Sequence, residues 1–561
     1  MSDRWLKLFK DATRNKADFL LDGAAYFESV IQAIEDAKTG EHYVYILGWM
    51  LDVDFTLVEN ESKTLYDVLN KAAARGVEIR ILIWDNLLPE YTKTFHDAVE
   101  RLNKLPNTTA MVDDHTFFPD AGKEYLRKAG PAVKKALLKI GDVLGDFRPE
   151  VAPQFSAVEI KGLSVNLILY RLLMFLSAPT VGAHHEKVVI VKNARGLVGF
   201  CGGIDFNSGR VMTKLKGRPR WFPSIHDNAC RLEGPAAHDL LQRFKRRWHH
   251  HPVADKTALR GENEPKPAAK PGPYPYAKVV GTFNSSDGSV KDRSLRDAYM
   301  AIIENAKTYI YIEDQYLVNV DVAKVLNRKL KQSGFLVLFL AIQDSIATSD
   351  IFIPNRKRGE FMTALLDGVS EPDQNKVVLA TFDRSRFERY NYHPGMHAKT
   401  LIVDDEIAII GSANVNQRSF TNDSETSVIV FDDNAKNDDN FARVFRIQTW
   451  KEYLRKKSEP RLMYESPYNY PMEISGRKPY LEIGSGNDNF SILVKYGKDN
   501  LEDADKRISK LISNNSVVGI MVAGAVFDYD LARTTSALSE GTITQIFDEV
   551  WDNVIEPRAP D

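Results

Sequence analysis

Hydrophobic and polar positions follow helical and then strand periodicity at several points along the chain, and parts of this pattern occur twice. Positions 33–38 predict an amphipathic helix that leads into the β-rich run Tyr43-Val-Tyr-Ile46. Much later, a helix at 301–307 leads into the similar run Tyr309-Ile-Tyr-Ile312. The chain therefore contains an internal repeat.

A second pair of segments repeats in the same order. One predicted helix runs to Gly76 and then to an apolar strand at 77–83, and another runs to Gly334 and a strand at 335–340. Glycine is common just past a helix end, where it is expected to act as the C-cap. Continuous apolar strands are typical of strands buried on both faces. Strand–helix–strand units in duplicate predict an α/β fold with two similar halves packed around mixed sheets.

Shifts in composition mark the boundaries between these units. The linker is rich in Pro and Lys and has no periodicity, and the insertion in the first half is helical and has no counterpart in the second. The sequence assigns no role to the small α/β extension at the C-terminus. The predicted units are a first half at 1–252 with an insertion at about 116–154, a linker at 253–276, a second half at 277–458 and an extension at 459–561.

The composition is that of an ordinary globular protein. Of 561 residues, 43% are hydrophobic and 27% are charged, which excludes a mostly disordered chain. The formal net charge of −2 provides no overall basic field for bulk binding of nucleic acid. The only cysteines are Cys201 and Cys230, which excludes a disulfide framework and a cysteine-rich metal site, and we expect a free, reduced pair.

No segment predicts a secretion signal or a membrane span. The N-terminus is amphipathic and lacks the continuous apolar core of a signal peptide. The most apolar stretch, 164–178, is too short to cross a bilayer and contains Asn166 and Arg171, so we interpret it as a buried or interfacial element. We expect a chain that is cytoplasmic as synthesised, with peripheral membrane binding or signal-less secretion left open.

A His-x-Lys motif occurs once in each half, each time next to an apolar β run. The first copy is His185-Glu-Lys187, and the second is His397-Ala-Lys399, which is followed by Asp404 and by Gly411-Ser-Ala-Asn414. Residues i and i+2 of a strand share a face, so each His points the same way as its Lys. A two-fold-like packing of the halves would place two imidazoles and two ammonium groups around one point.

That constellation suits the cleavage of a phosphodiester. The two Lys can stabilise the anionic phosphate and the charge that grows in the transition state. One His can attack phosphorus to form a phosphohistidine, while the other protonates the leaving alcohol and then deprotonates the incoming water or alcohol. This chemistry needs no metal and no cofactor. Each His should have a carboxylate on its second ring nitrogen.

The paired motifs and the downstream Gly-Ser-x-Asn sequence resemble the phospholipase D superfamily. The resemblance covers both halves, from about residue 22 to about residue 453, and is greatest to the larger phosphatidylcholine-type enzymes. It implies two phospholipase D-like α/β/α halves packed around a shared active site. Further matches are Leu21-Asp-Gly23, Gly202-Gly-Ile-Asp205, His226-Asp227, Gly234-Pro235 and Phe244 with Arg247-Trp248.

The resemblance also implies roles for individual residues. The first-half His185 would be the nucleophile, and the second-half His397 would be the general acid and base. Asp227 and Glu425 fall where the family places the carboxylates that orient the two His. The full set implied for catalysis is His185, Lys187, His397, Lys399, Asp227, Glu425 and Asp404.

Phosphate binding is implied for a second group of residues. Lys187, Lys399 and Asn414 would hold the phosphate, with Ser412 close by. Asp205 occupies in the first copy the position that Asn414 has in the second, and is placed in the same substrate-binding group.

The first motif departs from the family at one position. Lys192 stands where the family has an acid, and a longer turn follows it. In the family this acid, which is Asp404 in the second copy, is mainly a structural residue of the hairpin. We therefore expect activity to survive, with the longer turn able to supply a substitute contact.

Other polar clusters have simpler interpretations. The tract Trp248-His-His-His251 lacks Cys or carboxylates at ligand spacing and is interpreted as surface rather than a metal site, and His184 as core. Basic residues beside both motifs fit either a cationic rim for anionic head groups or a solvated loop. These basic residues are Lys214, Lys216, Arg218, Arg220, Arg356, Lys357, Arg358, Arg384, Arg386 and Arg389.

The sequence therefore predicts a phospholipase D that hydrolyses a glycerophospholipid to phosphatidic acid and an alcohol, and that also transfers the phosphatidyl group to primary alcohols. Two alternatives are a nuclease of the same chemistry, against which the net charge counts, and a catalytically inactive lipid-binding scaffold, which only Lys192 favours. The expected partner is a phospholipid membrane surface, and no nucleic acid is expected. A secretion-system or immunity partner is left open.

Overall fold

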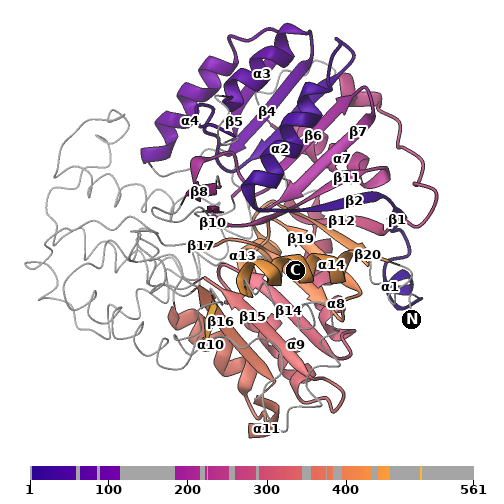
Figure 1. Cartoon of the computed structure of the whole chain (residues 1–561), viewed down its shortest axis with the longest axis vertical. Helices are drawn as coiled ribbons and strands as arrows, with labels where there is room; N and C mark the ends of the chain where they lie inside the picture. The colour runs from indigo at the N-terminus through magenta and orange to yellow at the C-terminus, as the bar shows by residue number, and fades with distance from the viewer. Residues whose placement is uncertain are drawn as a thin grey trace, which may run out of the picture.

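Two mixed β-sheets, one from each half of the chain, form the centre of the computed structural model (Figure 1). The predicted insertion at about 116–154, the apolar stretch at 164–178 and, apart from one short strand, the extension at 459–561 lie outside the described residues. The structure describes residues 3–57, 63–84, 89–113, 183–210, 212–214, 221–223, 225–251, 259–285, 290–343, 355–374, 376–382, 395–432, 440–454 and 493–495.

The first sheet has seven strands in the order β2-β11-β7-β6-β3-β4-β5. Strands β3, β4 and β5 are parallel to one another, and the other pairs are antiparallel. The strands are β2 (Lys16–Leu21), β3 (Tyr43–Gly48), β4 (Glu78–Trp84), β5 (Thr108–Asp113), β6 (Val188–Asn193), β7 (Gly196–Gly202) and β11 (Asn228–Glu233). The helices of this half are α2 (Asp22–Glu35), α3 (Leu65–Ala74), α4 (Pro89–Leu102) and α7 (Pro235–His250).

The second sheet repeats this arrangement. Its strands β12-β20-β19-β18-β14-β15-β16 stand in the same order as their counterparts in the first sheet, with β14, β15 and β16 parallel. The strands are β12 (Tyr276–Asn284), β14 (Tyr309–Asp314), β15 (Val337–Ile342), β16 (Val377–Phe382), β18 (Thr400–Val403), β19 (Ile407–Gly411) and β20 (Glu425–Phe431). The helices are α8 (Ser294–Glu304), α9 (Val320–Leu330), α10 (Asn355–Leu366), α11 (Glu371–Gln374), α13 (Gln417–Thr421) and α14 (Phe441–Leu454).

Short elements complete the described part. They are α1 (Asp3–Leu8), β1 (Thr13–Arg14), β8 (Met212–Lys214), β9 (Trp221–Pro223), β10 (Ile225–His226), β13 (Lys291–Asp292), β17 (Gly395–Met396), β21 (Leu493–Lys495) and the 3₁₀ turns η2 (Ser208–Arg210) and η3 (Arg260–Asn263). Strands β1 and β13 pair with β12, so residues 13–14 at the start of the chain join the second sheet, and β21 pairs with β16. The mixed α/β architecture with two similar halves is as predicted.

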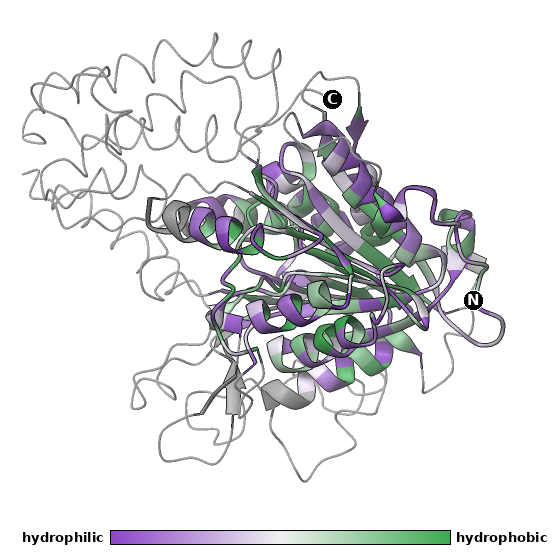
Figure 2. Ribbon diagram, turned by 90° about the horizontal axis from the view of Figure 1, so that it is seen from above, coloured by the Kyte–Doolittle hydropathy of each residue, from purple (hydrophilic) through white to green (hydrophobic). Residues whose placement is uncertain are grey.

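The repeated Tyr-x-Tyr runs explain how each sheet is buried on both faces. In β3, Tyr43 and Tyr45 belong to a central hydrophobic core, whereas the alternate residues of the strand face α2 and α3. In β14, Tyr309 and Tyr311 enter the same central core, and the alternate residues face α8 and α9. Side chains of a strand alternate between its faces, so the one pattern builds two cores. Both faces of the sheets are therefore hydrophobic, and Figure 2 shows green, hydrophobic residues along the central strands.

Helices α7 and α14 contribute aromatic residues to the central core. The Phe244 ring stacks on Tyr45 at 4.7 Å between centroids and on Trp248 of the same helix at 5.6 Å. In the second half, Trp450 lies edge-on to Tyr311 at 5.7 Å. Aromatic side chains bury the largest areas, and these rings all belong to the one central core, which contains residues of both halves.

The predicted helix ends are half correct. Gly76 follows α3 with φ +84°, the left-handed conformation expected at a C-cap glycine. Gly334 is not among the glycines with positive φ, and α9 has already ended at Leu330 with Lys331 as its C-cap. The prediction of a glycine cap at 334 is therefore wrong, because the helix is one turn shorter than its periodicity indicated.

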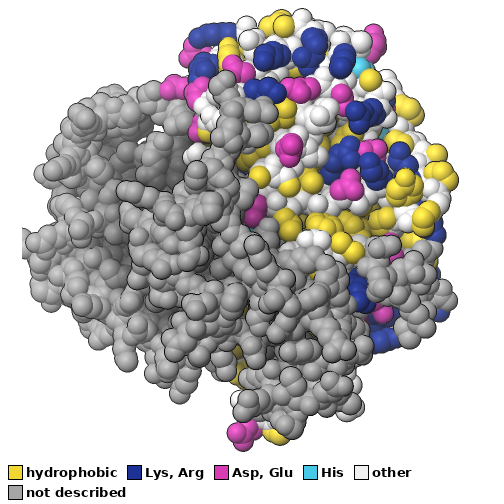
Figure 3. All heavy atoms as spheres, in the orientation of Figure 1, with side chains coloured by type: hydrophobic (Ala, Val, Ile, Leu, Met, Phe, Trp, Pro, Cys, Tyr) yellow, Lys and Arg dark blue, Asp and Glu magenta, His cyan; other side chains and the backbone are white. Residues whose placement is uncertain are grey.

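The structure also bears on the predicted free cysteines and on the predicted lack of a membrane span. Cys201 and Cys230 are free, buried and directly opposite each other on β7 and β11. Among the described residues, each helix falls short of the length and apolar character needed to span a bilayer. On the face shown in Figure 3, Lys and Arg side chains of the first half lie interspersed with Asp and Glu.

Candidate active site

Both His-x-Lys motifs lie where the two halves exchange short β-bridges. Strand β10 of the first half pairs in parallel with β17 of the second, so that His226 lies opposite Met396. The reciprocal bridge joins His184 to Ser424. Each bridge places the residue after it, a His from one half, beside a carboxylate residue from the other half. The halves therefore meet with the predicted two-fold-like symmetry. The pairing is crossed, because each half supplies the carboxylate for the His of the other half.

His185 is paired with a carboxylate of the second half. Its Nδ1 lies 3.0 Å from Oε1 and 3.2 Å from Oε2 of Glu425. Glu425 is fully buried and also accepts hydrogen bonds from the hydroxyls of Ser412 and Ser419. With Nδ1 engaged, the imidazole presents Nε2 to the site, which is the atom that a nucleophile needs.

His397 is paired with a carboxylate of the first half. Its Nδ1 lies 2.7 Å from Oδ2 of Asp227, whose other oxygen accepts from the backbone N–H of Asn228 at 2.9 Å. The His397 and His185 side chains are each 14% exposed, so both imidazoles are reachable from outside while their carboxylates are buried. The two imidazoles are thus held alike, each with its Nδ1 on a carboxylate of the other half and its Nε2 edge toward the site.

Each of the two lysines donates a hydrogen bond to the backbone carbonyl two residues before it. The Lys187 ammonium donates to the carbonyl of His185 at 2.8 Å, and the Lys399 ammonium donates to the carbonyl of His397. Lys187 also lies 3.4 Å from Oδ2 of Asp205. Burial lowers the pKa of Lys399 to about 8, although Asp227 and Asp314 oppose this shift. Both ammonium groups are therefore fixed beside the His residues, with little freedom to move.

Burial shifts the titration of the His and carboxylate groups in opposite directions. It lowers the pKa of His185 and of His397 well below the usual value, and nearby Lys residues add to the effect. It raises the pKa of Asp227 to about 6 and of Glu425 to about 7. A neutral imidazole at His185 suits nucleophilic attack, whereas His397 must gain a proton on Nε2 before it can act as a general acid.

Two residues predicted to bind phosphate are used differently. The Ser412 hydroxyl donates to Glu425 and is fully buried, so it supports the carboxylate instead of the phosphate. Asp205 accepts from the backbone N–H groups of Trp49 and Met50, each at 3.0 Å, and pairs with Lys187. Both side chains are thus engaged within the protein, and the phosphate contact predicted for each of them stays a prediction.

Asn414 remains a candidate for a phosphate contact. Such a contact would be donated by its amide NH₂, because Oδ1, which is buried without a hydrogen-bond partner among the described residues, can only accept. Its backbone N–H donates to the Ser419 hydroxyl at 3.2 Å. The sequence analysis did not identify Asp314, which in the second half plays the part that Asp205 plays in the first. Asp314 accepts a hydrogen bond from the backbone N–H of Val415 at 2.8 Å, and its negative charge interacts with the Lys399 ammonium. The feature of the sequence that could have pointed to Asp314 is its position just after the repeated run Tyr309-Ile-Tyr-Ile312.

A buried polar network lies behind His397. His226 is fully buried, with Nδ1 2.9 Å from Asp22 and Nε2 3.4 Å from Glu313 of the second half. Although burial opposes it, these two carboxylates raise the pKa of His226 well above its usual value. Asn228 donates to Glu313 at 2.8 Å and to Thr400 at 3.0 Å. The family matches at Asp22 and His226 pointed to these residues in the sequence. They did not predict that the network joins the two halves.

The motif acid of the second copy is structural, as expected. Asp404 accepts from the backbone N–H groups of Lys307, Thr308 and Tyr309 at 2.8 to 3.0 Å. Arg4 of α1 donates to Asp404 at 3.0 Å. Asp404 thus closes the turn before β14, and within the described residues its hydrogen bonds go to that turn and to Arg4. A direct part for Asp404 in catalysis stays a prediction.

A different residue does this work in the first copy. Nδ1 of His42 accepts from the backbone N–H groups of Lys38 and Thr39, at 2.9 and 3.3 Å. These correspond to Lys307 and Thr308 in the repeated Ala-Lys-Thr sequence. Burial and the nearby Lys192 lower the pKa of His42, which keeps it neutral and able to accept. The substitute contact comes from the turn before β3 instead of the expected turn after β6.

Lys192 has a partner of its own. Its ammonium lies 2.5 Å from Oε1 of Glu264, and the Tyr43 hydroxyl donates to the other oxygen at 3.3 Å. Restoring the family's acid with Lys192→Asp would remove this pair and place two carboxylates together. We expect a loss of about 2 kcal/mol in the free energy of unfolding, measured by urea denaturation. A matched control is Lys192→Gln, which should lose less, and a Lys192→Asp variant as stable as wild type would contradict the interpretation.

An aromatic wall stands beside His185. Trp49 lies edge-on to His185 at 5.9 Å between ring centroids and stacks on Trp84 at 5.9 Å. The Lys187 ammonium lies 5.6 Å from the centroid of Trp49. Both Trp side chains are partly exposed. The site therefore combines cationic groups for a phosphate with an apolar surface for the group attached to it.

Several clusters outside the site have structural explanations. Arg358 is fully buried and donates to the backbone carbonyls of Tyr316 and Gln343, so its assignment to a cationic rim is wrong. His184 is buried 3.3 Å from Asp113, which confirms it as core. In the His tract, Trp248 and His251 are buried whereas His249 and His250 are exposed, so the interpretation of the whole tract as surface is only half correct. The side chains of the other predicted rim residues, Lys357 excepted, lie outside the description.

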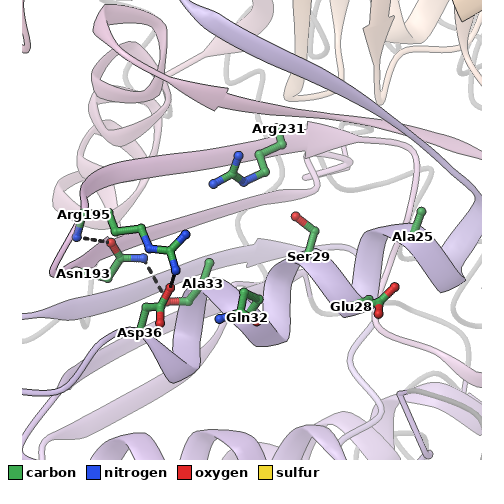
Figure 4. Close-up of a pocket in the computed structure, with 9 residues that line it drawn as sticks. All are labelled: Ala25, Glu28, Ser29, Gln32, Ala33, Asp36, Asn193, Arg195 and Arg231. Carbon is green, nitrogen blue, oxygen red and sulfur yellow. Dashed lines mark hydrogen bonds and ion pairs between the residues drawn. The ribbon is translucent and has the colours of Figure 1, made fainter.

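A groove of about 320 Å³ lies elsewhere in the described part of the protein (Figure 4). It runs between α2 and the hairpin of β6 and β7, where Arg195 pairs with Asp36 at 3.2 Å. Its lining contains none of the predicted catalytic or phosphate-binding residues. This groove is therefore separate from the site around the two His residues.

Two segments of this chain match family models, and most of its length matches known proteins. Residues 299–446 match a family model described as "Cardiolipin synthase, PLD-like domain", and residues 33–111 match one described as "Phospholipase D". Phospholipase D alpha 3 of Arabidopsis thaliana is 24% identical over 80% of this chain and 65% of its own length. Phospholipase D alpha 1 of Ricinus communis is 24% identical over 78% of this chain and, again, 65% of its own length. The chain thus spans just under two thirds of these relatives.

Two solved structures are similar in part. The phosphatidylserine synthase of Haemophilus influenzae Rd KW20 has a TM-score of 0.46 and 12% identity, covering 78% of this chain and 87% of that one. The phospholipase D family member Nuc of Salmonella typhimurium has a TM-score of 0.23 and 21% identity, covering 32% of this chain and 93% of that one.

Proposed function

Because the chain belongs to the phospholipase D superfamily, we propose that it cleaves the distal phosphodiester bond of a glycerophospholipid through a phosphohistidine on His185. The observation that carries the proposal is the crossed pairing, in which Glu425 holds His185 and Asp227 holds His397. Two equivalent, partly exposed imidazoles beside two ammonium groups suit a reaction in two matched steps.

In the first step, Nε2 of His185 attacks phosphorus, and the bond from phosphorus to the head-group oxygen breaks. His397 donates the proton on its Nε2 to the leaving alcohol. Lys187 and Lys399 offset the negative charge on the nonbridging oxygens. The product of this step is a phosphatidyl group bonded to His185.

In the second step, the neutral His397 removes a proton from water as its oxygen attacks phosphorus. The bond from phosphorus to nitrogen breaks, which releases phosphatidic acid and restores both His residues. A primary alcohol can take the place of water and gives a phosphatidyl alcohol. Asp227 and Glu425 keep Nδ1 of each ring protonated throughout, so that Nε2 is always the reacting atom.

Two observations support a lipid as the substrate. The curated relatives that match over most of this chain are named phospholipase D alpha. The Trp49 and Trp84 wall beside His185 provides apolar surface for the glycerol portion that stays attached to phosphorus. The net charge of −2 does not favour a nucleic acid.

The test is one reaction with the full chain, phosphatidylcholine vesicles, a few per cent ethanol and EDTA. We expect phosphatidic acid and phosphatidylethanol to form together, because both arise from one covalent intermediate. Hydrolysis without phosphatidylethanol would contradict the phosphohistidine, and loss of activity in EDTA would contradict a metal-free mechanism. If phosphatidylcholine is not cleaved, other head groups and then single-stranded DNA test the choice of substrate.

A further inference from the structure

Arg210 is a cationic group in the site that no sequence motif singled out. It ends the short 3₁₀ turn η2, which follows β7. Its Nη2 lies 3.2 Å from Nε2 of His397, and its Nε lies 3.9 Å from Oδ2 of Asp227. Arg210 is therefore directed at the same ring edge of His397 that the proposed mechanism needs for proton transfer.

The guanidinium is buried but incompletely bonded. Arg210 is 3% exposed, and its Nε and Nη1 have no hydrogen-bond partner among the described residues. A buried charge of this kind is costly unless it is paired. Arginine offers a planar fork of donors that fits a phosphate. The two unused donors of Arg210 therefore suit the phosphate of the substrate.

The backbone of Arg210 is pressed against the start of α2. A Cβ atom placed on Gly23 would lie 1.9 Å from the carbonyl oxygen of Arg210, so only glycine permits this approach. The preceding residue Asp22 has φ +60° and pairs with His226. The Leu21-Asp-Gly23 match in the sequence is thus explained as the platform that positions Arg210.

We propose that the Arg210 guanidinium covers Nε2 of His397 in the empty site and transfers its donors to a nonbridging phosphate oxygen when the diester binds. This inference rests on the proposed function. Arg210 thereby acts as a catalytic residue that binds the phosphate and uncovers the general acid. No bond is made or broken at Arg210, which keeps its proton throughout.

The transfer couples binding of the substrate to protonation of His397. An arginine N–H pointing at Nε2 excludes a proton there, and the positive charge disfavours the imidazolium. A bound phosphate draws the guanidinium away and adds a negative charge, so Nε2 can take up the proton that the leaving alcohol requires. The charged and titratable groups that face His397 are Arg210, Lys399, Lys187, His185 and Asp227.

The test measures kcat and kcat/KM against pH on a short-chain phosphatidylcholine for wild type, Arg210→Lys and Arg210→Ala. We expect Arg210→Ala to reduce kcat/KM by about 10² to 10³ at the optimum, the usual effect of losing one preorganised donor. Its alkaline limb should move to higher pH, because removal of a cation raises the pKa of His397 in the free enzyme. Arg210→Lys should keep the limb near its wild-type position. The control Arg195→Ala, in the separate groove, should change neither quantity.

In wild type the alkaline limb of kcat should lie at higher pH than that of kcat/KM, because the bound phosphate has already moved Arg210. This gap should close in Arg210→Ala. A rate loss with an unmoved limb would indicate a merely structural role and would overturn the proposal, as would an unchanged rate.

A second measurement does not depend on turnover. Inorganic phosphate is titrated into protein with ¹⁵N-labelled histidine, while calorimetry measures its affinity. We expect phosphate to shift the Nε2 signal of His397 in wild type and to bind at least about tenfold more weakly to Arg210→Ala. If wild type cleaves no phospholipid, the proposed function fails, and this titration still decides the role of Arg210. Equal phosphate affinity in the two proteins would overturn it.

Discussion

His185→Ala is expected to lose both hydrolysis and alcohol transfer, with kcat reduced on the order of 10⁶-fold, because no other group can carry the phosphatidyl intermediate. His397→Ala should lose about 10² to 10⁴-fold on a natural head group, the usual contribution of general acid–base catalysis. The measurement is release of choline and of phosphatidylethanol from the same vesicles, with each variant compared to wild type.

The two His variants should also differ in their response to the leaving group. With p-nitrophenolate in place of choline, no proton is needed to release the first product. His397→Ala should then recover a rapid burst of p-nitrophenolate, whereas His185→Ala should remain inactive. Equal recovery of both variants would contradict the assignment of one nucleophile and one acid.

Asp227→Asn is expected to reduce kcat by about 10⁴-fold while leaving the fold intact, as the wrong tautomer does in other catalytic pairs. The backbone N–H of Asn228 holds Oδ1 of Asp227, at 2.9 Å. The new amide NH₂ would therefore take the place of Oδ2 and face Nδ1 of His397. The ring would turn its lone pair to that amide and carry its proton on Nε2, where it can no longer act as a base toward water.

The matched control is Asp239→Asn, which removes an exposed carboxylate of α7 that pairs with Lys266. It should retain wild-type activity, and circular dichroism should show both variants folded. Glu425→Gln should behave like Asp227→Asn, since it faces the other imidazole in the same way. Full activity in Asp227→Asn would show that the crossed carboxylates do not set the tautomer.

The fold was largely predictable because it depends on local patterns. Alternation in the repeated Tyr-x-Tyr runs assigns two faces to β3 and β14, and the structure uses both faces. The duplication then predicts the second half from the first. The early pairing of β1 with β12 was not predictable, because a two-residue strand carries no periodicity and depends on a contact between residues more than two hundred positions apart.

The site was predictable in its residue types and less so in its connections. Each His and its Lys lie two residues apart directly before a strand, β6 or β18, so their spacing alone places them together. The pairing of each His with its carboxylate depends on β-bridges between the halves, such as that of His226 with Met396. The spacing of residues within one half does not predict these bridges. Arg210 was missed for a related reason, because an isolated arginine in a short turn has no pattern.

The Lys192 position shows how one local departure can mislead. Taken alone, the missing acid is the only sign of a lost activity. The structure places His42 on the equivalent backbone N–H groups and pairs Lys192 with Glu264. Both compensations come from segments distant in sequence from the motif, and neither is visible without the fold.

The central claim is a covalent phosphatidyl group on His185. Mass spectrometry after a denaturing quench at mildly alkaline pH, where the phosphorus–nitrogen bond survives, tests it most directly. The His397→Ala variant is mixed with a phosphatidyl p-nitrophenol ester, quenched within the burst and digested. The account predicts the added mass on the peptide that contains His185, and none on the same peptide from His185→Ala. The adduct on any other residue, or a burst of p-nitrophenolate without an adduct, would contradict the account.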